Sequence, residues 1–101
     1  MSNRYIHWLV TYSDEQLDNY IKETPFDLIF DDYHNLFAAW NVIRSKLYKY
    51  TDLESAVSKL GGEVKWDDDN VKIIQDLKEA NIEYERTLNK MNELTRKYNK
   101  R

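Results

Sequence analysis

PFDLIFDDYHNLFAAWNVIRSKLYKY, residues 25–50, carries a row of apolar side chains at alternating steps of four and three residues. The members of this row are Ile29, Tyr33, Leu36, Trp40, Ile43, Leu47 and Tyr50. Such spacing places all of them on one side of an α-helix and is typical of long helices that pack along each other at a shallow angle. Phe26, Phe30 and Phe37 flank the same side, so we expect a wide apolar surface that faces a core.

A second row with the same spacing runs through residues 70–99. Its members are Ile74, Leu77, Asn81, Tyr84, Leu88, Met91, Thr95 and Tyr98. This row is narrower than the first and includes polar residues, which suits either a coiled-coil-like seam or a helix that stays half exposed until a partner arrives. Asn81 has two interpretations: a polar residue at a seam position can set the register of paired helices, or it can simply face water.

Several signals mark where helices begin and end. Ser13–Gln16 and Thr51–Glu54 match the capping box, and Thr24-Pro25 places an N-cap residue before a proline. The acidic run at 67–70 favours the positive end of a helix dipole, and Gly61-Gly62 predicts a left-handed C-cap. These signals predict helices at 14–23, 25–50, 52–60 and 70–99, a less regular helix at 4–12, and an irregular connection at 62–66.

The expected fold class is therefore all-α: a small bundle of four or five helices. In this prediction the two long helices, about 25–50 and 70–99, pack side by side, and short helices close the core. At 101 residues the chain forms a single helical domain, 1–101. Two helices of about 26 and 30 residues span roughly 39 and 45 Å, which is long for such a domain, so we expect residues 86–101 to project or to pair with another chain.

Composition excludes several classes of protein. Hydrophobic residues make up 42% and charged residues 33% of the chain, and only two glycines and one proline occur, as in a helical globular protein. There is no cysteine, which rules out disulfides and thiolate chemistry and fits a reducing compartment. No apolar run approaches the roughly 20 residues that span a membrane, and residues 5–12 are too short for a secretory signal. We expect a cytoplasmic protein without a membrane partner.

The charge is unevenly distributed along the chain. Residues 1–70 hold seven Lys and Arg against thirteen Asp and Glu, a net charge of −6, whereas residues 71–101 hold eight against five, a net charge of +3. The basic end of the last helix can contact phosphates, so a nucleic-acid-binding module is the alternative hypothesis for function. The acidic balance of the whole chain argues against nucleic acid, and cations near a helix C-terminus also complement the helix dipole.

No stretch has the pattern of a catalytic, cofactor-binding or metal site. Asp31 and His34 look most like an active site, but a helical wheel places both about 145° or more from the apolar row, on the outer face. They supply only two ligands for a metal, and Asp67–Asp69 lacks the glycine and later ligands of a calcium loop. The glycine-rich phosphate-binding motifs and the serine nucleophile motif are also missing. We therefore expect no enzyme activity, no cofactor and no metal.

The remaining hypothesis is a non-enzymatic protein that acts by binding another protein, or a second copy of itself through the C-terminal helix. The candidate partner-binding residues are Asp32, Trp40, Arg44, Tyr48, Asn81, Arg86 and Lys90. Trp, Tyr and Arg are the usual anchors of protein interfaces, and Asp32 and Arg44 lie at the margins of the apolar row. By analogy of size and composition alone, adaptors, assembly factors and inhibitors, including phage- and plasmid-encoded ones, are of this type.

Overall fold

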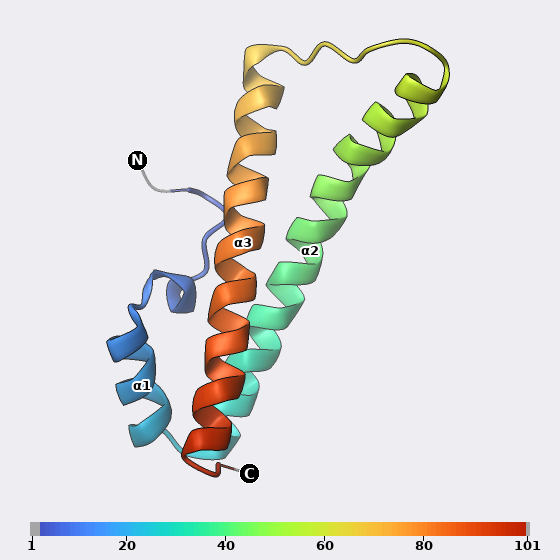
Figure 1. Cartoon of the computed structure of the whole chain (residues 1–101). Helices are drawn as coiled ribbons and strands as arrows, with labels where there is room; N and C mark the ends of the chain where they lie inside the picture. The colour runs from blue at the N-terminus through green and yellow to red at the C-terminus, as the bar shows by residue number, and fades with distance from the viewer. Residues whose placement is uncertain (1–2, 101) are drawn as a thin grey trace.

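The computed structural model describes residues 3–100 as an elongated helical molecule of 53 × 28 × 17 Å. A short 3-10 turn, η1 (Trp8–Thr11), precedes three α-helices: α1 (Asp14–Glu23), α2 (Phe26–Lys59) and α3 (Asp68–Lys97). Helices α2 and α3 run antiparallel, and α1 lies beside the C-terminal half of α3 (Figure 1). The all-α class is confirmed. The expected number of four or five helices is wrong, because this part of the chain forms three.

The missing helix boundary is the one predicted at residues 51–54. Helix α2 continues without interruption from Phe26 to Lys59. The Thr51 hydroxyl donates to the Tyr48 carbonyl at 3.2 Å, within the helix, instead of capping a new one. A capping box stabilises a helix start only where the chain reverses, and no glycine or proline between residues 48 and 54 breaks the helix.

Most of the other boundary signals act close to where they were predicted, but Thr24 does not cap α2, whose N-cap residue is Pro25 without a side-chain hydrogen bond. The Ser13 hydroxyl accepts from the Gln16 amide at 3.1 Å while the Gln16 side chain accepts from the Ser13 amide at 2.8 Å, a complete capping box. At the far end of α2, Gly61 has φ +82°, and the amide of Gly62 donates to the Val57 carbonyl at 3.0 Å. This arrangement is a Schellman motif, and it ends α2 where the glycine pair predicted.

The core is a thin layer along α3. The predicted row of α3 packs against the predicted row of α2, and the side chains of Ile74, Leu77, Tyr84, Leu88 and Met91 are buried. A second buried row on α3, which the sequence analysis missed, comprises Ala80, Thr87 and Leu94. This second row faces α1 and the N-terminal segment, so α3 is buried on two sides. The α3 seam is therefore occupied within the chain and is not free to pair with another molecule.

The N-terminal segment is mostly not helical, contrary to the prediction for residues 4–12. Only Trp8–Thr11 forms a turn of 3-10 helix; Arg4 and Tyr5 lie in a turn in which the Ile6 amide donates to the Asn3 carbonyl at 3.1 Å, and the segment runs beside α3 (Figure 1). The Tyr84 hydroxyl donates to the Tyr5 carbonyl at 2.6 Å, and the Asn3 side chain donates to the Asp76 carbonyl at 2.7 Å. The first of these long-range bonds satisfies a backbone group of the segment in place of a helical bond, and the second ties the Asn3 side chain to α3.

Residues 86–100, at the C-terminal end of α3, do not project as expected, and Arg101, the last residue of that predicted range, lies outside the described residues. The Tyr98 hydroxyl bonds both carboxylate oxygens of Asp18 at 2.9 Å, and the Lys100 ammonium donates to the Thr24 carbonyl at 2.8 Å. The end of α3 is thus held against α1 and the start of α2. Long helices fit a small domain here because the molecule is elongated rather than compact. None of the helices in the described part of the chain is long and apolar enough to cross a bilayer.

Candidate partner-binding surface

One flank of α2 carries a row of aromatic rings, of which Phe30, Phe37 and Tyr48 are exposed and the others are half-buried. The row, here called the aromatic stripe, comprises Phe26, Phe30, Tyr33, Phe37, Trp40 and Tyr48. Phe30 is 56% exposed, Phe37 39% and Tyr48 49%. The sequence analysis placed Phe26, Phe30 and Phe37 in the core, and for the two exposed rings this is wrong. A three-helix arrangement leaves this flank of α2 without a neighbouring helix within residues 3–100.

The rings of the stripe contact one another along the helix. The Phe26 and Phe30 centroids lie 6.2 Å apart, Tyr33 and Phe37 6.4 Å apart. Phe37 meets Trp40 edge-to-face at 5.4 Å. These distances fall in the range of favourable aromatic pairs, and the rings form two contacting groups, Phe26 with Phe30, and Tyr33 with Phe37 and Trp40. Exposed apolar rings gathered on one flank of a helix in this way mark an interaction surface.

Arg44 lies on the stripe between Trp40 and Tyr48. Its guanidinium carbon is 4.5 Å from the Trp40 ring centroid and 5.4 Å from that of Tyr48, and one of its nitrogens donates to the Tyr48 hydroxyl at 3.0 Å. Stacking on two rings holds the side chain in one position while leaving other donors free. Three of the four residues that the sequence singled out on α2 thus form one cluster.

Hydrogen bonds to α3 anchor the inner edge of the stripe. The Trp40 indole donates to the Asn81 side-chain oxygen at 2.9 Å, and the Asn92 side chain donates to the Tyr33 hydroxyl at 3.1 Å. Asn81 therefore sets the register of α2 against α3 inside the chain, the first of its two interpretations but with an intramolecular partner. Both rings are held by α3, so the stripe is preorganised.

The remaining predicted residues lie elsewhere and have partners within the chain. Asp32 accepts a hydrogen bond from the Tyr20 hydroxyl of α1. Arg86 pairs with Asp14 at 3.2 Å and with Glu83 at 3.3 Å, and Lys90 lies 3.5 Å from Glu93. Arg86 joins α3 to α1 through Asp14 and to η1 through the Val10 carbonyl, to which it donates at 3.4 Å, whereas the Asp32 bond joins α2 to α1. The seven predicted residues are thus split between the stripe and the surface that α1 covers.

Asp32 belongs to a second aromatic cluster, in which η1, α1 and α2 meet. The rings of Trp8, Tyr12 and Tyr20 contact each other edge-to-face with centroids 5.6 to 6.3 Å apart. Burial and the hydrogen bond to Asp32 raise the pKa of Tyr20, so its phenol stays protonated and donates. His7 caps η1, its Nδ1 accepting from the Leu9 amide at 3.1 Å. This cluster joins the N-terminal segment to the helices.

The stability of this cluster should depend on pH through His7. Burial lowers the pKa of His7 below its ordinary value of 6.5, although nearby Asp32 opposes the shift. The pKa of His7 is therefore lower in the folded protein than in the unfolded chain. The resulting contribution to the stability of the folded state is fully present above pH 6.5 and is lost as the pH falls toward the folded pKa. We expect His7→Asn, which keeps a capping acceptor, to reduce the loss of melting temperature between neutral and mildly acidic pH.

The matched control is the same substitution at exposed His34, which leaves His7 in place. Thermal unfolding followed by circular dichroism across this pH range compares the three proteins. An unchanged pH response in the His7 variant contradicts the prediction.

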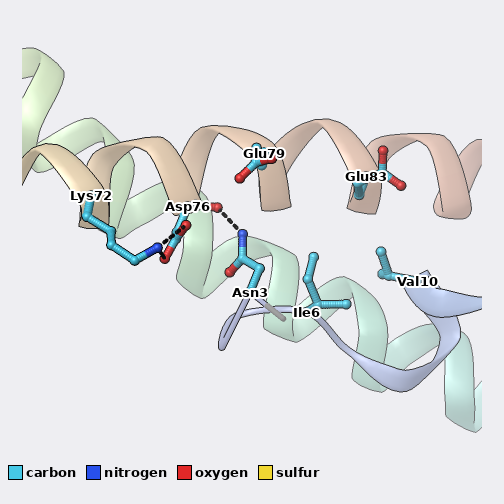
Figure 2. Close-up of a pocket in the computed structure, with 7 residues that line it drawn as sticks. All are labelled: Asn3, Ile6, Val10, Lys72, Asp76, Glu79 and Glu83. Atoms are coloured by element: carbon cyan, nitrogen blue, oxygen red, sulfur yellow. Dashed lines mark hydrogen bonds and ion pairs between the residues drawn. The ribbon is translucent and has the colours of Figure 1, made fainter. Parts of the chain in front are cut away.

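An acidic groove lies on the opposite side of the molecule, where the N-terminal segment meets α3 (Figure 2). It encloses about 410 Å³ and is lined by Asn3, Ile6, Val10, Lys72, Asp76, Glu79 and Glu83. Lys72 pairs with Asp76 at 3.5 Å, and Arg86 pairs with Glu83. Two of its three carboxylates thus have cationic partners within the chain. The groove is an open seam between two segments.

No metal-ligand cluster accompanies these surfaces. Within residues 3–100, no three His, Asp or Glu side chains lie close enough together to hold a metal ion. Comparison with protein-family models, with curated proteins and with solved structures finds no match to this chain. The fold and the stripe define an all-helical protein with one preorganised aromatic surface, and any statement of function rests on that surface.

Proposed function

We propose that the protein is not an enzyme and that it works by binding another polypeptide through the aromatic stripe of α2. The observation that carries the proposal is the exposure of Phe30 and Phe37 on a stripe whose inner edge is fixed by Asn81 and Asn92. Exposed aromatic rings beside a stacked arginine are the side chains that anchor protein interfaces. A preorganised surface loses little conformational entropy on binding. Adaptors, assembly factors and inhibitors act through such surfaces.

The test is a comparison of two single substitutions on α2. Phe37→Asp places a charge in the middle of the stripe, and Val42→Asp places the same charge at a 55% exposed site about 140° around the helix. We expect the wild-type protein and the Val42 variant to bind the same polypeptide, and the Phe37 variant to lose at least about tenfold in affinity, since burying an unpaired charge costs well over 1.4 kcal/mol.

Binding is measured by affinity capture with quantitative mass spectrometry, and by sedimentation for self-association. Circular dichroism spectra that agree among the three proteins show that each variant is folded. Equal binding by both variants contradicts the proposal.

The alternative, nucleic-acid binding through the basic end of α3, has less support. Arg86, Lys90 and Lys97 each lie within 3.5 Å of a carboxylate of the same chain, so their charges are partly neutralised. Binding through phosphates would need several free cations on one face. The proposal also places the protein in the cytoplasm, which the absence of cysteine supports.

A further inference from the structure

We propose that a small pocket, on the other side of α2 from the aromatic stripe, binds an anionic amphiphile: a small molecule with an acidic head group and an apolar body. The pocket lies where the N-terminal segment, α2 and α3 meet, and its volume is about 250 Å³. The residues that line it are Tyr5, Lys46, Lys49, Tyr50, Ile73 and Leu77. Lys46 lies about 180° around α2 from Phe37, so this inference does not depend on the proposed function.

The interior of the pocket is apolar. Leu77 of α3 is fully buried, and Ile73, one turn earlier, is half-buried against the same core. The half-buried rings of Tyr5 and Tyr50 line the pocket beside them. An apolar pocket with a few convergent polar groups is the usual form of a small-molecule site. Sites for drug-sized ligands have about 300–1,000 Å³, so this pocket suits a smaller molecule.

The two tyrosine walls of the pocket are held in place by other segments. The Tyr5 carbonyl accepts from the Tyr84 hydroxyl of α3 at 2.6 Å. The Tyr50 hydroxyl donates to the Asn70 side-chain oxygen at 3.2 Å, and its ring meets Trp66 edge-to-face with the centroids 5.2 Å apart. The shape of the pocket is therefore present before a ligand arrives, which lowers the entropic cost of binding.

Two ammonium groups at the pocket have no carboxylate partner within residues 3–100. Lys46 and Lys49 lie three residues apart on α2, and neither forms an ion pair in that range. The Lys46 ammonium lies 5.5 Å from the centroid of the Tyr5 ring, and the Arg4 guanidinium carbon lies 5.0 Å from the same centroid. None of the six described lining residues is acidic. The pocket thus sets positive charge beside an apolar surface, and an anionic amphiphile has the complementary arrangement.

A bound amphiphile joins parts of the chain that are far apart in sequence. Its head group pairs with the ammonium groups of Lys46 and Lys49, and its apolar body lies against Ile73, Leu77 and the Tyr5 ring. These contacts come from α2, α3 and the N-terminal segment, so they exist together only in the folded protein. A ligand that binds the folded state alone raises the melting temperature, by an amount that grows with its concentration.

The first test compares probes that separate the charge from the apolar body. Octanoate has both, 1-octanol has the chain without the charge, and acetate has the charge without the chain. In isothermal titration calorimetry, octanoate should have a dissociation constant at least about tenfold below those of 1-octanol and acetate. Octyl phosphate, titrated in the same way, shows which acidic head group binds more tightly. If octanoate binds no better than 1-octanol or than acetate, the proposal is wrong.

The second test removes the positive charge. The double variant Lys46→Gln, Lys49→Gln should bind octanoate at least about tenfold more weakly than the wild type and should lose the rise in melting temperature. The matched control is Lys59→Gln, Lys78→Gln, which removes two other exposed lysines without ion pairs in residues 3–100 and should bind octanoate as the wild type does. Equal losses in both double variants would show a general effect of net charge and overturn the site.

The third test locates the ligand. In two-dimensional amide NMR spectra, octanoate should shift the signals of Tyr5, Lys49 and Ile73 and leave those of Phe30 and Phe37 in place. Shifts confined to the aromatic stripe would put the ligand there and overturn the pocket as its site. Neither that result nor a failure of octanoate to bind bears on the proposed function, which is decided separately by polypeptide capture with the variants of the stripe.

Discussion

Replacing Leu36 by alanine should lower the free energy of unfolding by about 2–5 kcal/mol, the usual cost of removing a large aliphatic side chain from a close-packed core. Leu36 is fully buried and lies near the middle of α2, in the row that faces α3. In a molecule only 17 Å thick, few other side chains can move in to fill the cavity. A loss of this size is a large part of the roughly 5–15 kcal/mol that stabilises a small domain.

Leu28→Ala is the matched control on the same helix. Leu28 is 55% exposed, so the same chemical change should cost well under 1 kcal/mol. Urea unfolding of both variants and of the wild type, followed by far-ultraviolet circular dichroism, measures the difference. A similar loss in both variants would show that the row through Leu36 is not the packed seam between α2 and α3.

Tyr84→Phe should cost about 1–3 kcal/mol and should loosen the N-terminal segment more than the helices. Tyr84 is 2% exposed, and its hydroxyl donates to the Tyr5 carbonyl at 2.6 Å. Burial raises the pKa of Tyr84, so the phenol remains a donor at neutral pH. Without the hydroxyl, the Tyr5 carbonyl loses its partner in a region where few backbone groups have helical bonds.

Tyr48→Phe is the control, because Tyr48 is 49% exposed and its hydroxyl bonds only the Arg44 side chain among residues 3–100. Amide hydrogen exchange separates local from global effects. In the Tyr84 variant, the amides of Ile6 and Val10, which donate to the Asn3 and His7 carbonyls, should exchange faster than those in the middle of α3. Uniform acceleration along the chain would contradict a local anchoring role.

The pairing of the two long helices was predictable because it depends on a periodic pattern. The α2 row through Leu36 and the α3 row through Leu77 repeat every 3.5 residues; most of their members are buried as predicted, and the others, Tyr33 and Trp40 among them, are half-buried. The ends marked by Ser13 and Gly61 were also predictable, because capping depends on neighbours within a few residues.

The features that depend on distant contacts were not predictable. Thr51 matches a capping box, yet whether the chain turns there depends on the packing of α3 alongside α2. At this level of the two helices the Tyr50 hydroxyl donates to the Asn70 side-chain oxygen at 3.2 Å. The buried row at Ala80 and Thr87 is weakly apolar, so no hydrophobic pattern pointed to a second packed face of α3. The segment before η1 looked helical in its spacing, but it is not helical, and its Tyr5 carbonyl is held by Tyr84, far along the chain.

The same distinction holds for the candidate partner-binding surface: some of its residues were predictable from the sequence, and the exposure of others was not. Trp40, Arg44 and Tyr48 could be named from the sequence because a cation among aromatic residues on one side of a helix is visible in the spacing alone. Whether Phe30 and Phe37 are core or surface depends on how many helices surround α2, and the three helices found in place of four or five leave them exposed.

The sequence by itself thus determined the helices, their apolar faces and most of their ends, because those properties arise from side chains a few residues apart. Only the tertiary structure decided which of the apolar faces are covered. Burial depends on the space that the other segments occupy: α1 and the N-terminal segment cover one side of the α2–α3 pair, and the aromatic stripe on the other side remains open.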